Sequence, residues 1–135
     1  MRKYIRYPID LPVSIEKETE DPRGHYALQN CSQGGMSFRS AVSFTPDTLV
    51  SVTMPLIASD CVLQGIVRWC IHPRDYYEIG VEFQETNDFF RIRLIEQICY
   101  IKHYQKERAQ SDGQQLSDEQ AAREWVAKYA GHFVR

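Results

Sequence analysis

The sequence predicts a mainly β protein with α: a six-stranded antiparallel β-barrel followed by two C-terminal helices. Three observations lead to this prediction. Apolar residues alternate with polar ones in short segments between residues 11 and 83. Turn residues separate these segments at the 8–12-residue spacing typical of barrels and sandwiches. Beyond residue 87 the apolar period changes to that of an α-helix.

About six segments have the strand pattern. The first alternates Leu11, Val13 and Ile15 with polar residues. The others cover residues 25–32, 36–39, 50–54, 61–71 and 77–83. Gly65 interrupts the longest segment, and we expect a β-bulge or a barrel bend there.

Two helices are expected over residues 88–108 and 118–130. In the first, apolar residues recur at helical spacing at Phe90, Leu94, Ile98 and Ile101. Asp112 and Gly113 break the pattern. Ser117 with Gln120 three residues later predicts a capping box at the start of the second helix. We therefore expect a barrel with an N-terminal arm over residues 1–86 and a helical appendage of the same domain over 87–135.

Composition excludes several classes of protein. The net charge of −2 argues against a nucleic-acid or membrane-surface binder driven by bulk charge. No apolar run approaches the roughly 20 residues of a membrane span, and no secretory signal is evident. We therefore expect a cytoplasmic chain without membrane insertion. Its cysteines are then expected to be reduced thiols at Cys31, Cys61, Cys70 and Cys99.

Two arginines four residues apart, Arg2 and Arg6, lie at the start of the sequence. A guanidinium group binds phosphate or a guanine edge through two parallel hydrogen bonds, and it also stacks on bases. In an extended segment the two side chains would lie roughly 13 Å apart, whereas in a helical turn they would be neighbours. Both geometries stay open, as does a frayed, charged N-terminus. Lys3 adds a further positive charge.

A second motif, Asn30-Cys31-Ser32-Gln33-Gly34-Gly35, ends the second predicted strand. Asn30 and Ser32 are two residues apart, so on a strand they share a face and can hydrogen-bond a guanine edge. Gly34 and Gly35 allow a positive φ, or the close approach of a ligand to the backbone. The alternative is a polar strand end that runs into a Gly-Gly turn.

These two motifs, in this order, resemble those of the PilZ domain family, whose ligand is the bacterial second messenger cyclic diguanylate (cyclic di-GMP). The resemblance covers roughly residues 1–105 and includes the barrel pattern. It implies that Arg2 and Arg6 wrap the phosphates and bases of the ligand as the arm becomes ordered. It also implies that Asn30 and Ser32 bind a guanine and that Gly35 admits the ligand. Lys3 stands where a further Arg is common, which keeps the charge but weakens bidentate contact.

The resemblance further implies that Trp69 stacks on a guanine, a contact worth roughly 1–3 kcal/mol. The alternative is a Trp buried in the barrel core, because Trp69 shares its face with Val67 and Leu63. Lys3, Gly34 and Arg68 are secondary candidates for ligand contact. We expect Arg68 to be a solvated surface charge rather than part of the cationic patch.

No pattern typical of an enzyme is found in the sequence. The four histidines are far apart, and neither His nor Cys has the spacing of a metal site. The glycines match no phosphate-binding or dinucleotide-binding fingerprint. We therefore expect neither catalysis, nor a metal, nor a cofactor other than the ligand cyclic di-GMP.

The expected function is that of a stand-alone cytoplasmic cyclic di-GMP receptor that signals to an effector protein. The resemblance implies motility, pilus or exopolysaccharide machinery as the target. The alternative is an adaptor that binds no nucleotide and docks a partner on Trp125, Val126 and Tyr129. Exposure of Trp125 would favour that adaptor. A third possibility, a barrel that binds single-stranded nucleic acid, is disfavoured by the net charge.

Overall fold

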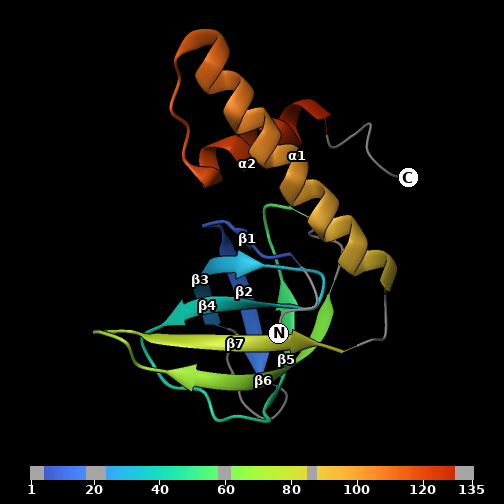
Figure 1. Ribbon diagram of the computed structural model, residues 1–135. Coiled ribbons are helices and arrows are strands. Elements are labelled where there is room, and N and C mark those ends of the chain that lie inside the picture. Colours follow the sequence, from blue (N-terminus) through green and yellow to red (C-terminus); the bar gives the residue numbers. More distant parts are fainter. Residues whose placement is uncertain (1–4, 18–23, 58–61, 85–87, 130–135) are drawn as a thin grey trace.

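The computed structural model describes residues 5–17, 24–57, 62–84 and 88–129. It shows a β-barrel with a pair of helices at one end (Figure 1). The strands, in chain order, are β1 (Tyr7–Pro8), β2 (Pro12–Lys17), β3 (Gly24–Cys31), β4 (Gly35–Ser40), β5 (Leu49–Thr53), β6 (Leu63–Ile71) and β7 (Tyr77–Phe83). The helices are α1 (Asp88–Asp112) and α2 (Asp118–Tyr129).

The described strands form one antiparallel sheet in the order β1-β3-β2-β5-β6-β7-β4, and a further pairing of β3 with β4 closes it. Strands β2 to β7 therefore make the predicted six-stranded barrel. Strand β1 was not predicted. It pairs with the end of β3 that β2 does not reach, through Tyr7 opposite Cys31 and Pro8 opposite Asn30.

Two strands each contain one extra residue. In β3, Leu28 lies opposite Phe38 and Asn30 lies opposite Ser37, so Gln29 is the additional residue. In β6 the same shift falls between Val67 and Trp69. These are β-bulges, which redirect the side chains that follow them.

The bulge expected at Gly65 is therefore misplaced, because Gly65 pairs regularly with Phe83 and Val50. A Cβ at Gly65 would lie 2.5 Å from Cγ1 of Val81. Close packing inside the barrel, rather than a bulge, explains the glycine. The inward residues Leu28, Phe38, Val67 and Ile79 are fully buried.

Both helices were predicted, the first from the period of its apolar residues and the second from its capping box. Helix α1 extends to Asp112, beyond the expected end at residue 108, and the chain leaves it at Gly113 with a φ of 69°. The capping box of α2 is confirmed. The Ser117 N–H donates to Gln120 Oε1 (2.9 Å), and the Gln120 N–H donates to Ser117 Oγ (3.0 Å).

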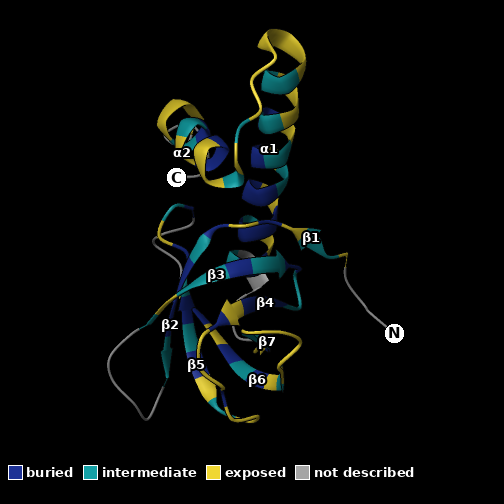
Figure 2. Cartoon of the chain, turned by 90° about the vertical axis from the view of Figure 1, so that its left-hand side faces the viewer, coloured by how far each residue is buried: buried dark blue, intermediate teal, exposed yellow. Residues whose placement is uncertain are grey.

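The two helices pack against each other through their buried faces (Figure 2). Ile98 and Ile101 of α1, with Ala121 and Ala122 of α2, are completely buried. Trp125 is 5% exposed and stacks on Tyr100 at 6.1 Å between ring centroids. Within the described residues, no helix combines the length and apolarity that crossing a bilayer requires.

Candidate functional site

The two bulges turn Asn30 and Trp69 to the outer surface of the barrel. Leu28 and Val67 point into the core, and in a regular strand a residue two positions further on would point inward too. The extra residue in each strand reverses this, so Cys31 and Cys70 return to the inner face while Asn30 and Trp69 face outward. Trp69 therefore does not share a face with Val67, which sets aside the interpretation as a core residue.

Asn30 and Trp69 lie in one row across four neighbouring strands. Asn30 of β3 is opposite Ser37 of β4, Ser37 is opposite Gly80 of β7, and Gly80 is opposite Trp69 of β6. Three interstrand spacings of about 4.8 Å separate the ends of this outer row by about 14 Å. The two small residues in its middle, Ser37 and Gly80, are both buried.

The Trp69 side chain lies over Gly80. A Cβ added to Gly80 would lie 2.0 Å from Cε2 of the indole, so only glycine admits the ring in this position. Gly80 was not among the residues singled out from the sequence. A glycine in the middle of an alternating strand is, however, a recognised signal of close approach.

Ser37 also escaped the sequence analysis. Its neighbours Met36 and Phe38 are core residues, and Arg39 is exposed, which puts Ser37 on the outer face. Its exposed fraction is nevertheless 0%, and its Oγ makes no hydrogen bond among the described residues. A buried hydroxyl without a partner is unusual, and the sequence pattern contains no signal for it.

Arg6 lies at the Asn30 end of the row. Its Nη1 donates a hydrogen bond to Asn30 Oδ1 at 2.9 Å. The pairing of β1 with β3 explains this contact, because Pro8 lies opposite Asn30 and Arg6 shares its face. Arg2 and Lys3, the other predicted residues of the arm, lie outside the described residues.

The Ser32 hydroxyl is already engaged within its own turn. It accepts hydrogen bonds from the Gly34 N–H (3.1 Å) and the Gly35 N–H (3.3 Å), and it donates to the Gly35 carbonyl (3.4 Å). Only 8% of Ser32 is exposed. Through these hydrogen bonds Ser32 shapes the β3–β4 turn beside Asn30.

Neither Gly34 nor Gly35 has a positive φ; the only described glycine that does is Gly113. The positive φ considered for these glycines is therefore wrong, whereas the close approach of a ligand stays a prediction. A Cβ at Gly35 would lie 2.1 Å from the carbonyl oxygen of Val81, so the glycine permits the close approach of β4 to β7.

Two further side chains near the row have structural explanations. Cys31, between Asn30 and Ser32, is fully buried, and desolvation raises its pKa to about 12, an effect that a hydrogen bond with Ser32 and the charge of Arg6 only partly offset. Burial and the raised pKa both disfavour the thiolate that a nucleophilic cysteine needs. Arg68 is exposed and pairs with Glu82 (2.6 Å) and Asp47 (3.6 Å), as expected for a surface charge.

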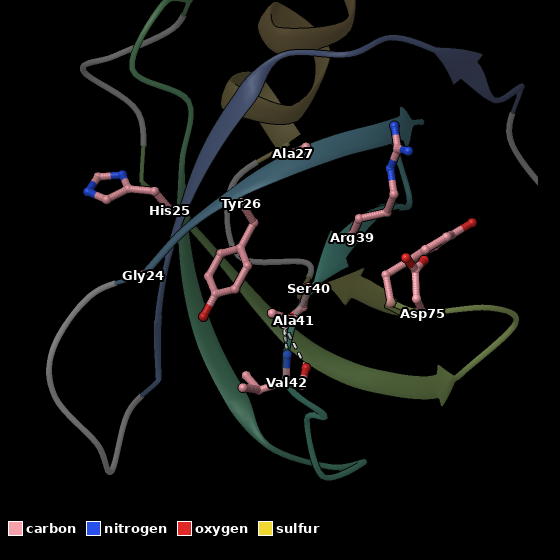
Figure 3. A pocket seen from close by; sticks show the side chains of 10 residues that line it. Gly24, His25, Tyr26, Ala27, Arg39, Ser40, Ala41, Val42 and Asp75 are labelled. Carbon is pink, nitrogen blue, oxygen red and sulfur yellow. Dashed lines mark hydrogen bonds between the residues drawn. The ribbon is translucent and has the colours of Figure 1, made fainter.

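A cleft of about 690 Å³ opens elsewhere, at the start of β3 and the end of β4. Figure 3 shows Tyr26, Arg39 and Asp75 around it. None of the predicted ligand-binding residues that the structure describes lines this cleft. No cluster of three or more potential metal ligands occurs in the part of the chain that the structure describes.

Comparison with known proteins places the fold. The family model for the PilZ domain matches residues 1–100. No curated protein matches the chain. Among solved structures, the PilZ domain of Escherichia coli YcgR with c-di-GMP is 14% identical at a TM-score of 0.61, covering 82% of this chain and 98% of that one.

Two longer proteins are also similar. The MrkH–c-di-GMP complex of K. pneumonia is 15% identical at a TM-score of 0.63 and covers 82% of this chain. The Bacillus subtilis inhibitor of motility (MotI/DgrA) is 21% identical at a TM-score of 0.61 and covers 80% of this chain. This chain spans 56% and 54% of their lengths, respectively. At these identities the likeness shows the fold, and together with the family match it establishes that the chain belongs to the PilZ domain family.

Proposed function

We propose that this PilZ domain is a receptor for cyclic di-GMP, which binds along the outer row from Arg6 and Asn30 to Trp69. The observation that supports this most strongly is the pair of bulges. Each one turns a predicted ligand-binding side chain, Asn30 or Trp69, out of the core and into the same row. Bulges are over-represented next to binding sites for this reason.

The row has chemistry suited to a guanine dinucleotide. Arg6 offers a forked, permanently charged donor for phosphate or for guanine O6 and N7. Asn30 offers a donor pair and an acceptor for a guanine edge. At the other end, the indole of Trp69 offers a stacking surface. The span of about 14 Å is of the size of a dinucleotide.

In the structure, Arg6 donates a hydrogen bond to Asn30. Ligand binding would replace this hydrogen bond with charge-assisted bonds to the ligand. Arg2 and Lys3 would complete the clamp from the arm. The ordered arm and the ligand together would then form a surface for an effector protein, with motility, pilus or exopolysaccharide systems as the proposed targets.

Calorimetric titration with cyclic di-GMP tests this function. The wild-type chain should bind cyclic di-GMP in preference to GTP and cyclic di-AMP. Arg6→Ala and Asn30→Ala should each weaken binding by about 10-fold or more, since a hydrogen bond to a charged group is worth roughly 1.5–3 kcal/mol. If both variants bind the messenger as tightly as wild type, the assignment fails.

Arg123→Ala is the matched control. Arg123 is an exposed arginine of α2, paired with Glu119 at 2.9 Å, and it is not part of the proposed site. Its replacement removes one positive charge, as Arg6→Ala does, and should leave affinity unchanged. An equal loss in both variants would indicate attraction by net charge rather than a defined site.

The adaptor alternative depends on Trp125 being available to a partner. Trp125 is instead 5% exposed and packed between α1 and α2. Tyr129 remains 47% exposed, and Val126 is partly buried. The burial of the largest apolar side chain of the stripe favours the receptor.

A further inference from the structure

Residues 6–10, which we call the arm root, are linked to the helix pair by hydrogen bonding to the carboxylate of Asp118. Its Oδ2 accepts a hydrogen bond from the backbone N–H of Asp10 at 2.8 Å. Its Oδ1 accepts from Lys102 Nζ (2.8 Å) and from Gln105 Nε2 (2.9 Å), both on α1. Asp118 is itself the first residue of α2. Three parts of the molecule therefore meet there: the arm root, α1 and α2.

The segment between Arg6 and Asp10 is held residue by residue. Tyr7 and Pro8 pair with the end of β3, and the Ile9 N–H donates to the Gln29 carbonyl (3.1 Å). Just beyond Asp10, the Leu28 N–H donates to the Leu11 carbonyl (2.9 Å). Arg6, whose guanidinium contacts Asn30, and Asp10, whose amide contacts Asp118, are only four positions apart in the sequence.

A second contact ties the same segment to α1. The side chain of Tyr7 lies beside that of Cys99 of α1, and interaction with Cys99 together with desolvation raises the pKa of Tyr7. Tyr7 and Cys99 both pack against the core. The arm root thus contacts α1 through Tyr7 and the α1–α2 junction through Asp10.

We propose that Asp118 is a positioning residue for the ligand site: by fixing Asp10 it holds the arm root on β3, so that Arg6 is aimed at the outer row. This inference rests on the proposed function and adds a residue from outside the segment that the family model matches. Coupling between ligand binding and the hydrogen bond from Asp10 to Asp118 is reciprocal. Ligand on the outer row therefore also stabilises the bond between Asp10 and Asp118, and with it the first turn of α2.

A pair of variants separates the arm contact from the helix contact. Asp118→Ala removes the bonds to Asp10, Lys102 and Gln105, whereas Lys102→Ala removes only the ion pair to α1. Calorimetric titration with cyclic di-GMP should show about five-fold or more weaker binding for Asp118→Ala. Lys102→Ala should stay within about two-fold of wild type. Fluorescence of Trp125 and thermal melts monitor whether α2 is intact.

Amide hydrogen exchange in the wild-type chain gives a readout that does not depend on a variant folding. Saturating cyclic di-GMP should slow exchange at Asp10, and also at Ala121, whose N–H donates to the Ser117 carbonyl in the first turn of α2 (2.9 Å). Unchanged exchange at both amides, despite saturated binding, would overturn the proposal.

The proposal also fails if Asp118→Ala binds like wild type, or if Lys102→Ala loses as much affinity as Asp118→Ala. In those cases the receptor function stands, provided that Arg6→Ala still weakens binding. If the wild-type chain binds no cyclic di-GMP at all, the proposed function itself fails and the positioning role with it.

Discussion

Gly35 and Gly80, on the outer face of the barrel, are required by two different close contacts. At Gly35 a Cβ would meet the backbone carbonyl of Val81, which can move only with its strand. At Gly80 it would meet the indole of Trp69, a side chain that can swing away. The same substitution should therefore have different consequences at the two positions.

We expect Gly35→Ala to lower the free energy of unfolding by about 1–3 kcal/mol, as overpacking does. Gly80→Ala should cost less stability but displace Trp69 and weaken cyclic di-GMP binding. Denaturant unfolding measures the first effect, and Trp69 fluorescence with calorimetry measures the second. The reverse order of the two stability losses would contradict the geometry described for these glycines.

The Cys31 thiol is shielded even though it lies between two predicted ligand-binding residues. Its pKa is raised to about 12 by burial, so almost no thiolate is present at neutral pH. Iodoacetamide at pH 8 should leave Cys31 unmodified in the folded chain, while the half-buried Cys70 reacts. Peptide mass spectrometry reads out each cysteine, and denatured protein provides full labelling as the control. Labelling of Cys31 as fast as Cys70 would show that the β3–β4 turn opens readily.

At the scale of elements, most strands and helices could be predicted because each segment is long enough for the period of its apolar residues to be detected. The strand Tyr77–Phe83 has the bounds that were expected. The two-residue β1 could not be predicted in this way, because so short a segment has no period. Its existence depends on the free end of β3.

The bulges show why the directions in which the candidate site residues face could not be predicted from the sequence. Sequence alone left Trp69 either in the core or against a ligand, because the period-2 rule assigns it to the face of Val67. Only the pairing of β6 with β7 shows that the register shifts between them. Asn30, Arg6 and Trp69 could be named as candidates from their chemistry. Ser37 could not, because its significance comes from burial on an outer face.

The capping box of α2 should make a measurable contribution to stability. Ser117→Ala leaves the Gln120 N–H without its side-chain acceptor, and loss of such a cap costs about 1 kcal/mol. Urea unfolding followed by Trp125 fluorescence measures it. Ser111→Ala, at an exposed serine near the end of α1, is the control and should change stability little. Equal effects of the two substitutions would argue against the cap.

At the scale of the whole molecule, Asp118 links barrel and helices in a pH-dependent way. Burial opposes its ionisation, but hydrogen bonds from Lys102, the Asp10 N–H and Gln105 outweigh this, so its pKa is lowered below 3.8. A carboxyl whose pKa is lower in the folded state stabilises the fold above its unfolded pKa of about 3.9. That contribution is lost as pH falls through the folded value.

The difference in unfolding free energy between wild type and Asp118→Ala should therefore be constant from pH 7 to about pH 4.5 and shrink below about pH 4. Denaturant unfolding across this range measures it. Glu119→Ala is the control, because the exposed pair of Glu119 with Arg123 should contribute little at any pH. A difference that grew on acidification would contradict the assignment of an ionised, bonded Asp118.

The proposed function requires cyclic di-GMP to lie along the outer row and not in the 690 Å³ cleft. Amide and indole chemical shifts, recorded while cyclic di-GMP is added, distinguish these two places directly. We predict that the largest changes occur at the Trp69 indole N–H, the Asn30 side-chain amide and the Ser37 and Gly80 backbone amides, with Ala41 and Val42 of the cleft unmoved. Chemical-shift changes concentrated at Ala41 and Val42, with no change at the residues of the outer row, would contradict the proposed position of the ligand.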